Sequence, residues 1–166
     1  MSLIDIDFDR QDNPVDAIET VAAIQDWVFE RSGDDEITIS VSGHWSEYLV
    51  SFSWLDNHEA IHLGCAFDLK VVETRRDEVA KLLARVNEQM WMGHFDLWSK
   101  EGVVMFRQSL LLAGGAEVTH GQIERMLVNA IECCERYYQA VQFVVWAGQS
   151  CEDALSTVMF ETVGEA

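Results

Sequence analysis

The sequence predicts an α+β fold, in which an antiparallel sheet packs against helices in the order α-βββ-α-ββ-α, followed by an extra short C-terminal helix. Apolar and polar residues alternate through residues 37–69, as in strands with one buried face. Apolar residues recur at helical spacing before and after this region. The loops between the strands are short, which indicates antiparallel pairing. Because there is one proline and no linker-like segment, we expect a single domain over residues 1–166.

The first helix is predicted to begin at Asn13-Pro14, because Asn is a favoured N-cap and Pro is tolerated at the first helical position. Apolar residues continue at helical spacing to about Arg31, and residues 32–35 are expected to end the helix. Three strands follow, at residues 37–41, 48–54 and 61–69. The third alternates most clearly, and the short loops between the three strands predict an antiparallel meander.

The second helix is predicted between Thr74 and Gly93, followed by strands at residues 95–97 and 103–112. Thr119 with Gln122 forms a capping box that opens a long helix ending near Ala147. Ser150 is expected to cap the last, short helix. Its inward-facing residues are predicted to be Ala154, Leu155, Val158 and Met159.

The charge of the chain is strongly negative, with 11 Lys and Arg against 29 Asp and Glu and a formal net charge of -18. Nucleic-acid backbones and anionic membrane surfaces are bound by clustered basic residues, so we expect neither as a partner. The first ten residues lack the basic start and apolar run of a signal peptide, and no stretch is long and apolar enough to span a membrane. The sequence therefore predicts a cytoplasmic protein.

One short motif matches a zinc-protease signature, His58-Glu59-Ala60-Ile61-His62. The chemistry requires both histidines on one turn of a helix. Here the segment leaves a hairpin loop and enters a strand, where residues four apart lie about 13 Å from each other. We interpret the motif as a chance match and expect no metal site.

Other catalytic signatures are missing: the sequence contains no G-x-S-x-G, no P-loop and no G-x-G-x-x-G. The four cysteines contain no CxxC pair and are expected to be reduced thiols. The sequence therefore predicts no catalytic residues, no cofactor and no enzymatic activity.

Aromatic and sulfur-containing residues provide the best candidates for a binding surface, since Trp is enriched at interfaces. Trp91 and Trp98 flank the turn at Gly93. Residues 143–146 are apolar on every side of their helix, which predicts burial on more than one face. The candidate interface residues are Met90, Trp91, Met92, Trp98, Phe143 and Trp146.

The chain also resembles a known family, the YbjN-like proteins, which are described as bacterial sensory transduction regulators. The carrying segments are Arg136–Tyr138, Gln142–Trp146, Gly148, Glu152–Leu155 and Glu161–Ala166, with Asp68, Lys70 and Asn87. The family is similar to the scaffold of type III secretion chaperones, which are small, acidic homodimers that bind extended segments of other proteins. The resemblance implies a cytoplasmic homodimer with a protein partner.

Three functions remain open at this point. We favour a non-enzymatic binding protein, either a signal-transduction regulator or a chaperone-like homodimer. The alternatives are an enzyme with an unrecognised site and a structural subunit of a larger assembly. The partner itself and its pathway are not encoded in any motif.

Overall fold

A six-stranded antiparallel sheet organises the molecule, with the strands in the order β1-β2-β3-β4-β6-β5. The computed structural model describes residues 10–164, and side chains of residues 10–160. The strands are β1 (Val28–Arg31), β2 (Glu36–Ser42), β3 (Glu47–Leu55), β4 (Ala60–Lys70), β5 (His94–Trp98) and β6 (Val103–Leu111). The predicted α+β class and the antiparallel pairing are confirmed.

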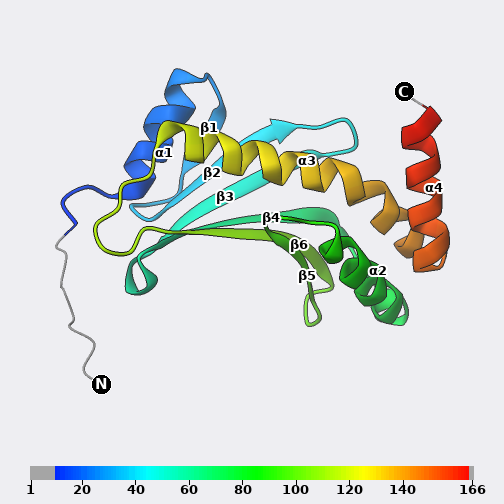
Figure 1. Ribbon diagram of the computed structural model, residues 1–166. Coiled ribbons are helices and arrows are strands. Elements are labelled where there is room, and N and C mark those ends of the chain that lie inside the picture. Colours follow the sequence, from blue (N-terminus) through cyan, green and yellow to red (C-terminus); the bar gives the residue numbers. More distant parts are fainter. Residues whose placement is uncertain (1–9, 165–166) are drawn as a thin grey trace.

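Four helices accompany the sheet: α1 (Pro14–Ile24), α2 (Arg76–Glu88), α3 (His120–Val145) and α4 (Cys151–Gly164). Short 3-10 turns lie at Asp56–His58 and Glu73–Arg75. Figure 1 shows α3 running along the sheet, with α1 over β1 to β3 and α2 beside β5. The last helix, α4, crosses the C-terminal end of α3 and contacts both α3 and α2.

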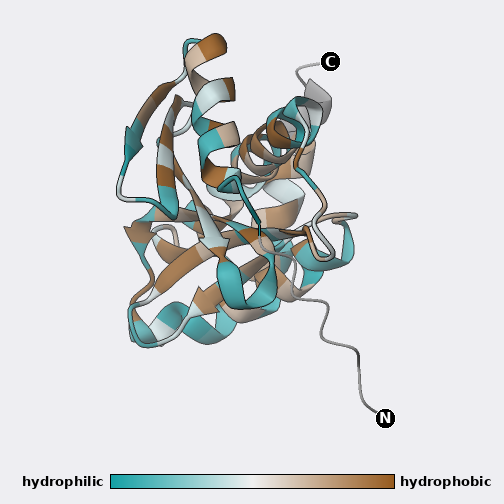
Figure 2. Ribbon diagram, turned by 90° about the vertical axis from the view of Figure 1, so that its left-hand side faces the viewer, coloured by the Kyte–Doolittle hydropathy of each residue, from teal (hydrophilic) through white to brown (hydrophobic). Residues whose placement is uncertain are grey.

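The helices cover one face of the sheet and leave the other open. On β4, buried Ile61, Leu63 and Cys65 alternate with more exposed His62 and Gly64. Figure 2 shows this alternation as brown and paler bands along the strands. The buried face continues into α3, which is covered over a wide arc because it contacts β3, β4, β6, α1 and α2. Burial of this apolar surface is the main stabilising contribution to the fold.

The first helix is shorter than predicted, and the sheet has one more strand. The helix α1 ends at Ile24, Asp26 adopts a positive φ of 54°, and β1 then pairs with β2. The prediction extended the helix because the apolar residues up to Val28 also fit helical spacing. Arg31 of β1 forms ion pairs with Asp16 and Glu19 of α1, which ties the edge strand to the helix.

The C-terminal region also differs from the prediction. Ala154 and Val158 of α4 are buried as expected, whereas Met159 is 67% exposed. Residues 143–146 were predicted to be buried on more than one face. Val144 is buried, but Trp146 is 65% exposed, so the prediction fails at the end of this segment. The reason is that α3 ends at Val145 and the chain turns at Gly148 with a φ of 67°. At 14 residues, α4 is longer than the short helix predicted.

Within the described part of the chain, none of the helices combines the length and hydrophobicity that a membrane crossing requires.

Candidate protein-binding groove

A groove of about 550 Å³ lies between the α2–β5 connection and α3. We call it the Trp91 groove. It is lined by Gln89, Met90, Trp91 and Met92 from the connection and by Asn129, Glu132, Cys133, Glu135, Arg136 and Tyr137 from α3. Trp91 is 78% exposed, although its ring is large and apolar. A side chain of this kind left in water at the rim of a groove is typical of a binding surface.

The connection that carries Trp91 has a fixed backbone shape. Gly93 has a φ of 78°, a region that non-glycine residues rarely adopt. A β-carbon at Gly93 would also overlap the Phe106 ring of β6. The chain can therefore turn sharply and closely over β6 only with glycine at this position, and this turn positions Met92 and Trp91 beside α3.

Hydrogen bonds of two buried side-chain amides also fix the α2–β5 connection. Asn129 Nδ2 donates to Gln108 Oε1 at 2.9 Å and approaches the Met92 carbonyl oxygen at 3.4 Å. Asn129 and Gln108 are 6% and 5% exposed, and they are the buried polar residues of the described core. Buried amides stabilise one arrangement strongly when they are paired, since leaving either unpaired costs free energy. The network thus fixes α3, β6 and the Trp91 connection relative to one another.

The charged lining of the groove is acidic. Glu132 and Glu135 contribute two carboxylates against one guanidinium, that of Arg136. Between them lies the Cys133 thiol, whose pKa is raised mainly by burial. The thiol therefore stays protonated and adds to the apolar surface rather than acting as a nucleophile. The lining of the groove therefore combines apolar side chains with a net negative charge.

Glu135 also fixes the neighbouring hairpin between β2 and β3. Its carboxylate accepts hydrogen bonds from the backbone N–H of His44 at 3.1 Å and of Trp45 at 3.4 Å. A β-carbon at Gly43 would overlap this carboxylate. Burial raises the pKa of Tyr48, and the nearby Glu135 adds to that effect. Glu135 therefore connects α3 to the hairpin and has less freedom to meet a ligand than Glu132.

The structure brings three of the six predicted interface residues together. Met90, Trp91 and Met92 line the groove, and Met90 also packs partly on the core. Trp98 lies at the end of β5, where its register partner is Val103, and is 43% exposed. Phe143 and Trp146 lie at the C-terminal end of α3 and do not line the groove. The assignment of these residues to an interface stays a prediction.

Sequence reasoning missed the α3 wall of the groove. On α3, the adjacent residues Glu132 and Cys133 lie three or four residues after Asn129 and three or four residues before Arg136. This spacing places them on one face of α3. They were missed because only the apolar positions of the helix were considered.

The motif from His58 to His62 begins in a 3-10 turn and enters β4. Glu59 has a left-handed backbone with a φ of 48°, so the two histidines do not share a helical turn. Within the residues that the structure describes, no three His, Cys, Asp or Glu side chains are grouped so that they could hold a metal ion.

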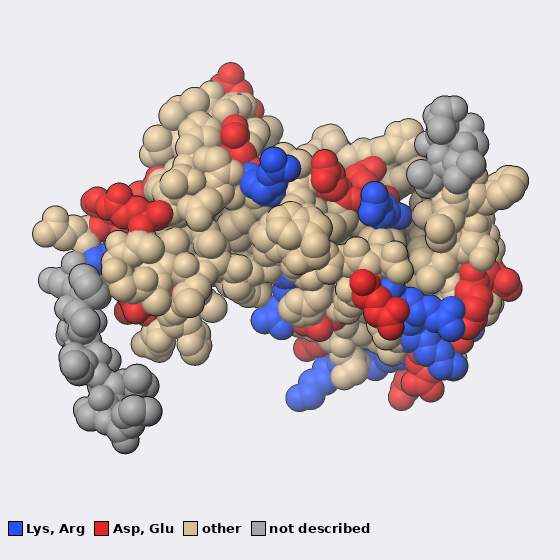
Figure 3. All heavy atoms as spheres, viewed as in Figure 1, with Lys and Arg blue, Asp and Glu red and all other residues tan. Residues whose placement is uncertain are grey.

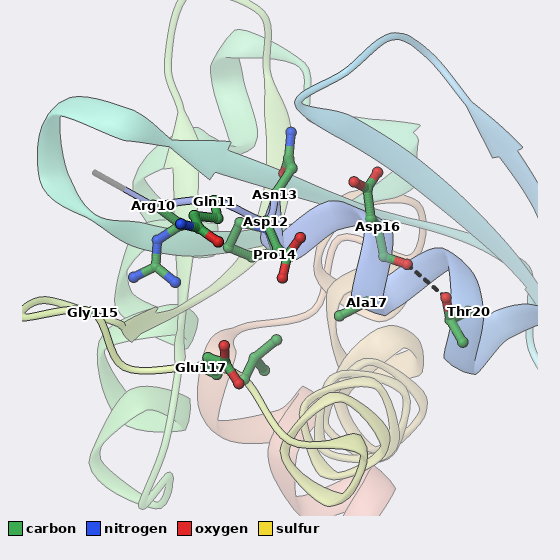
Figure 4. Close-up of a pocket in the computed structure, with 11 residues that line it drawn as sticks. Arg10, Gln11, Asp12, Asn13, Pro14, Asp16, Ala17, Thr20, Gly115 and Glu117 are labelled. Carbon is green, nitrogen blue, oxygen red and sulfur yellow. Dashed lines mark hydrogen bonds between the residues drawn. The ribbon is translucent and has the colours of Figure 1, made fainter. Parts of the chain in front are cut away.

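A second cavity, of about 570 Å³, lies at the N-terminal end of α1 (Figure 4). Asp12, Asp16 and Glu117 stand around it, and the Thr20 hydroxyl donates to the Asp16 carbonyl at 3.0 Å. Figure 3 shows acidic side chains at several places over the molecule and a mixed group of basic and acidic ones at the lower right. Acidic side chains are therefore not confined to this second cavity.

The features above define a class: an acidic α+β domain with a helix-covered sheet, an open opposite face and a groove beside α3. A family model described as "Putative bacterial sensory transduction regulator" (YbjN) matches residues 14–143. The chain belongs to this family. The matched range ends within α3, so α4 lies outside it.

Three solved structures are similar to this chain, and the first of them supports the fold. The crystal structure of YbjN from E. coli superposes with a TM-score of 0.55 at 13% identity, over 73% of this chain and 85% of that one. A chain of the ExsC–ExsE complex matches with a TM-score of 0.49 at 18% identity, over 76% and 94% of the two chains. A chain of the HopA1–SchA chaperone–effector complex gives 0.45 at 14% identity, over 69% and 84%. No protein with curated annotation matches the sequence.

Proposed function

We propose that this protein is a non-enzymatic regulator or chaperone-like protein that binds a segment of another protein in the Trp91 groove. The observation that carries the proposal is the exposure of Trp91 on a connection held rigidly by Gly93 and by the Asn129 network. A preorganised aromatic side chain loses little conformational entropy on binding, which favours its use as an anchor. The family description, a regulator, agrees with this reading.

The chemistry of the groove specifies the kind of segment. Met90, Met92 and Trp91 offer soft, adaptable apolar contacts to one or two large side chains. The carboxylate of Glu132, in a chain of net charge -18, favours a neighbouring Lys or Arg. We therefore expect an apolar segment flanked by a basic residue.

Binding in the groove is favoured over addition of a strand to β5. Two hydrogen bonds with Asn87 occupy the backbone N–H and carbonyl of Phe95, at the outer edge of β5. A partner strand would have to displace the Asn87 side chain before pairing there.

The test compares two exposed tryptophans. The variants Trp91→Asp and Trp146→Asp carry the same substitution at sites of similar exposure, but only Trp91 lines the groove. A partner captured from native lysate and then purified should bind Trp91→Asp at least about 30-fold more weakly, since an anchor residue contributes about 2 kcal/mol or more. Binding by Trp146→Asp should equal that of the wild type. Equal losses in both variants would contradict the proposal.

We further propose that the working form is a homodimer. Sedimentation equilibrium at micromolar concentration should give twice the chain mass of 18.9 kDa. A strict monomer at that concentration would contradict the dimer and leave the groove proposal untouched.

A further inference from the structure

A third cavity, of about 340 Å³, opens where β4, β5 and β6 meet the Gly93 turn. It is lined by His62, Met92, Gly93, His94, Arg107, Gln108 and Ser109. The other two described cavities each have at least two carboxylates in their lining, whereas this one has none. This cavity is therefore unusual in a chain of net charge -18, because its ionisable lining residues are one arginine and two histidines.

The polar side chains of this cavity come together through strand register. Gly64 of β4 lies opposite Arg107 of β6, which lies opposite His94 of β5. His62 lies opposite Ser109 in the neighbouring row. Residues opposite one another in antiparallel strands point to the same face, so all four side chains project from the open face of the sheet.

Two hydrogen bonds fix the position of Arg107 and leave other N–H donors of its guanidinium unused. Arg107 Nε donates to His62 Nε2 at 3.1 Å, and Nη1 donates to Asp96 Oδ2 at 3.1 Å. The same Asp96 oxygen lies 3.1 Å from His94 Nε2. A guanidinium has five N–H donors, of which these contacts use two. Because His62 Nε2 accepts from Arg107, the His62 proton resides on Nδ1, which is a further donor.

We propose that this cavity binds an oxyanion, a phosphate or carboxylate group, through the remaining donors of Arg107 together with His62, His94 and Ser109. Asp96 is a positioning residue that orients Arg107 and His94. Charge-assisted hydrogen bonds from a guanidinium to such oxygens are among the strongest in proteins. The site lies on the open face of the sheet, shares only Met92 with the Trp91 groove and does not rest on the proposed function.

The experiment is an NMR titration of the full chain with inorganic phosphate, observing the imidazole signals of His62 and His94. Sodium chloride at matched ionic strength controls for screening. We expect saturable shifts with a Kd on the order of 1 mM. In Arg107→Gln the affinity should fall at least tenfold, whereas Arg125→Gln, the same charge change at an exposed residue of α3, should leave it unaltered.

His94→Gln provides a second variant, since the His94 side chain is 49% exposed and its loss spares the core. It should also weaken phosphate binding. Linear shifts equal to those with chloride, or unchanged affinity in both Arg107→Gln and His94→Gln, would overturn the proposal. A peptide with one phosphoserine distinguishes the source of the anion: binding more than tenfold tighter than phosphate indicates a partner chain, and equal binding indicates a free anion.

Discussion

The side-chain amide of Asn87 in α2 forms two hydrogen bonds with the backbone of Phe95 in β5. Nδ2 donates to the Phe95 carbonyl at 3.1 Å, and Oδ1 accepts from the Phe95 N–H at 2.8 Å. Asn87 thus takes the place of a neighbouring strand at the outer edge of the sheet, since β5 is the last strand in the order. An edge closed in this way is protected from pairing with other chains.

Asn87→Ala should destabilise the protein by about 1–3 kcal/mol, because Phe95 is buried and both of its backbone groups lose their partner. Urea unfolding measures the change. The matched control is Asn57→Ala, in the exposed 3-10 turn, where a change within about 0.5 kcal/mol is expected. Equal stabilities of the two variants would show that the edge contact contributes nothing.

The Asn129–Gln108 pair should behave as a coupled unit. Asn129→Ala leaves the buried Gln108 amide without its donor and should cost about 1–3 kcal/mol. Replacing both residues by Leu removes the polar groups together and should cost less than the sum of the two single Leu substitutions. A double-mutant cycle in urea measures this, and strictly additive single effects would argue against the pair.

The corner between α3 and α4 depends on two charged side chains, Arg75 in the 3-10 turn before α2 and Glu78 in the first turn of α2. Arg75 donates from Nε to the Val144 carbonyl at 2.9 Å and from Nη2 to the Gln149 carbonyl at 2.6 Å. Glu78 Oε2 accepts from the Cys151 N–H at the start of α4. A cation thus lies at the C-terminal end of one helix and an anion at the N-terminal end of the next, which matches their dipoles.

Arg75→Gln should therefore loosen α4 more than the rest of the molecule. Hydrogen exchange should become at least several-fold faster for the amides of α4, while α1 keeps its protection. Arg125→Gln, which changes the same charge elsewhere on the surface, should leave both helices unaltered. Uniform acceleration over the whole chain would indicate a global rather than a local effect.

The imidazole of His62 should titrate below its ordinary range. Burial lowers its pKa, and the charges of Arg107 and His94 add to the effect. As pH falls through about 6.5, the unfolded chain takes up a proton at this position before the folded chain does. The free energy of unfolding therefore decreases until the folded pKa is passed. His62→Gln should remove this part of the decrease in urea unfolding across that pH range, and an unchanged profile would contradict the assignment.

The regular part of the fold follows from the sequence because its signals are local. Alternation from Ile61 to Leu69 specified β4, and Thr119 with Gln122 forms the predicted capping box at the start of α3. The missing element was β1. Its four residues fit helical spacing. Its strand state depends on pairing with β2 across a short turn and on Arg31 reaching Asp16 of α1, and the spacing of apolar residues reports neither contact.

One wall of the candidate groove could be predicted from the sequence, and the other could not. Trp91 and its two methionines stand out by composition, but the α3 wall depends on how α2 and β5 pack against α3. Gln108 continues the inward alternation of Val104 and Phe106, and Asn129 lies within the buried stripe of α3. Two polar residues at inward positions therefore signalled a buried pair, although only the tertiary structure shows that they meet.

Site-specific photocrosslinking shows whether a partner segment lies in the Trp91 groove. A photoreactive phenylalanine analogue replaces Trp91 in one variant and Trp146 in another, and the crosslinked peptides are identified by mass spectrometry after irradiation in cells. We expect one recurrent adduct at position 91, to an apolar segment with a basic neighbour, and none at position 146. Adducts at position 146 alone, or the same adducts at both positions, would contradict binding in the Trp91 groove.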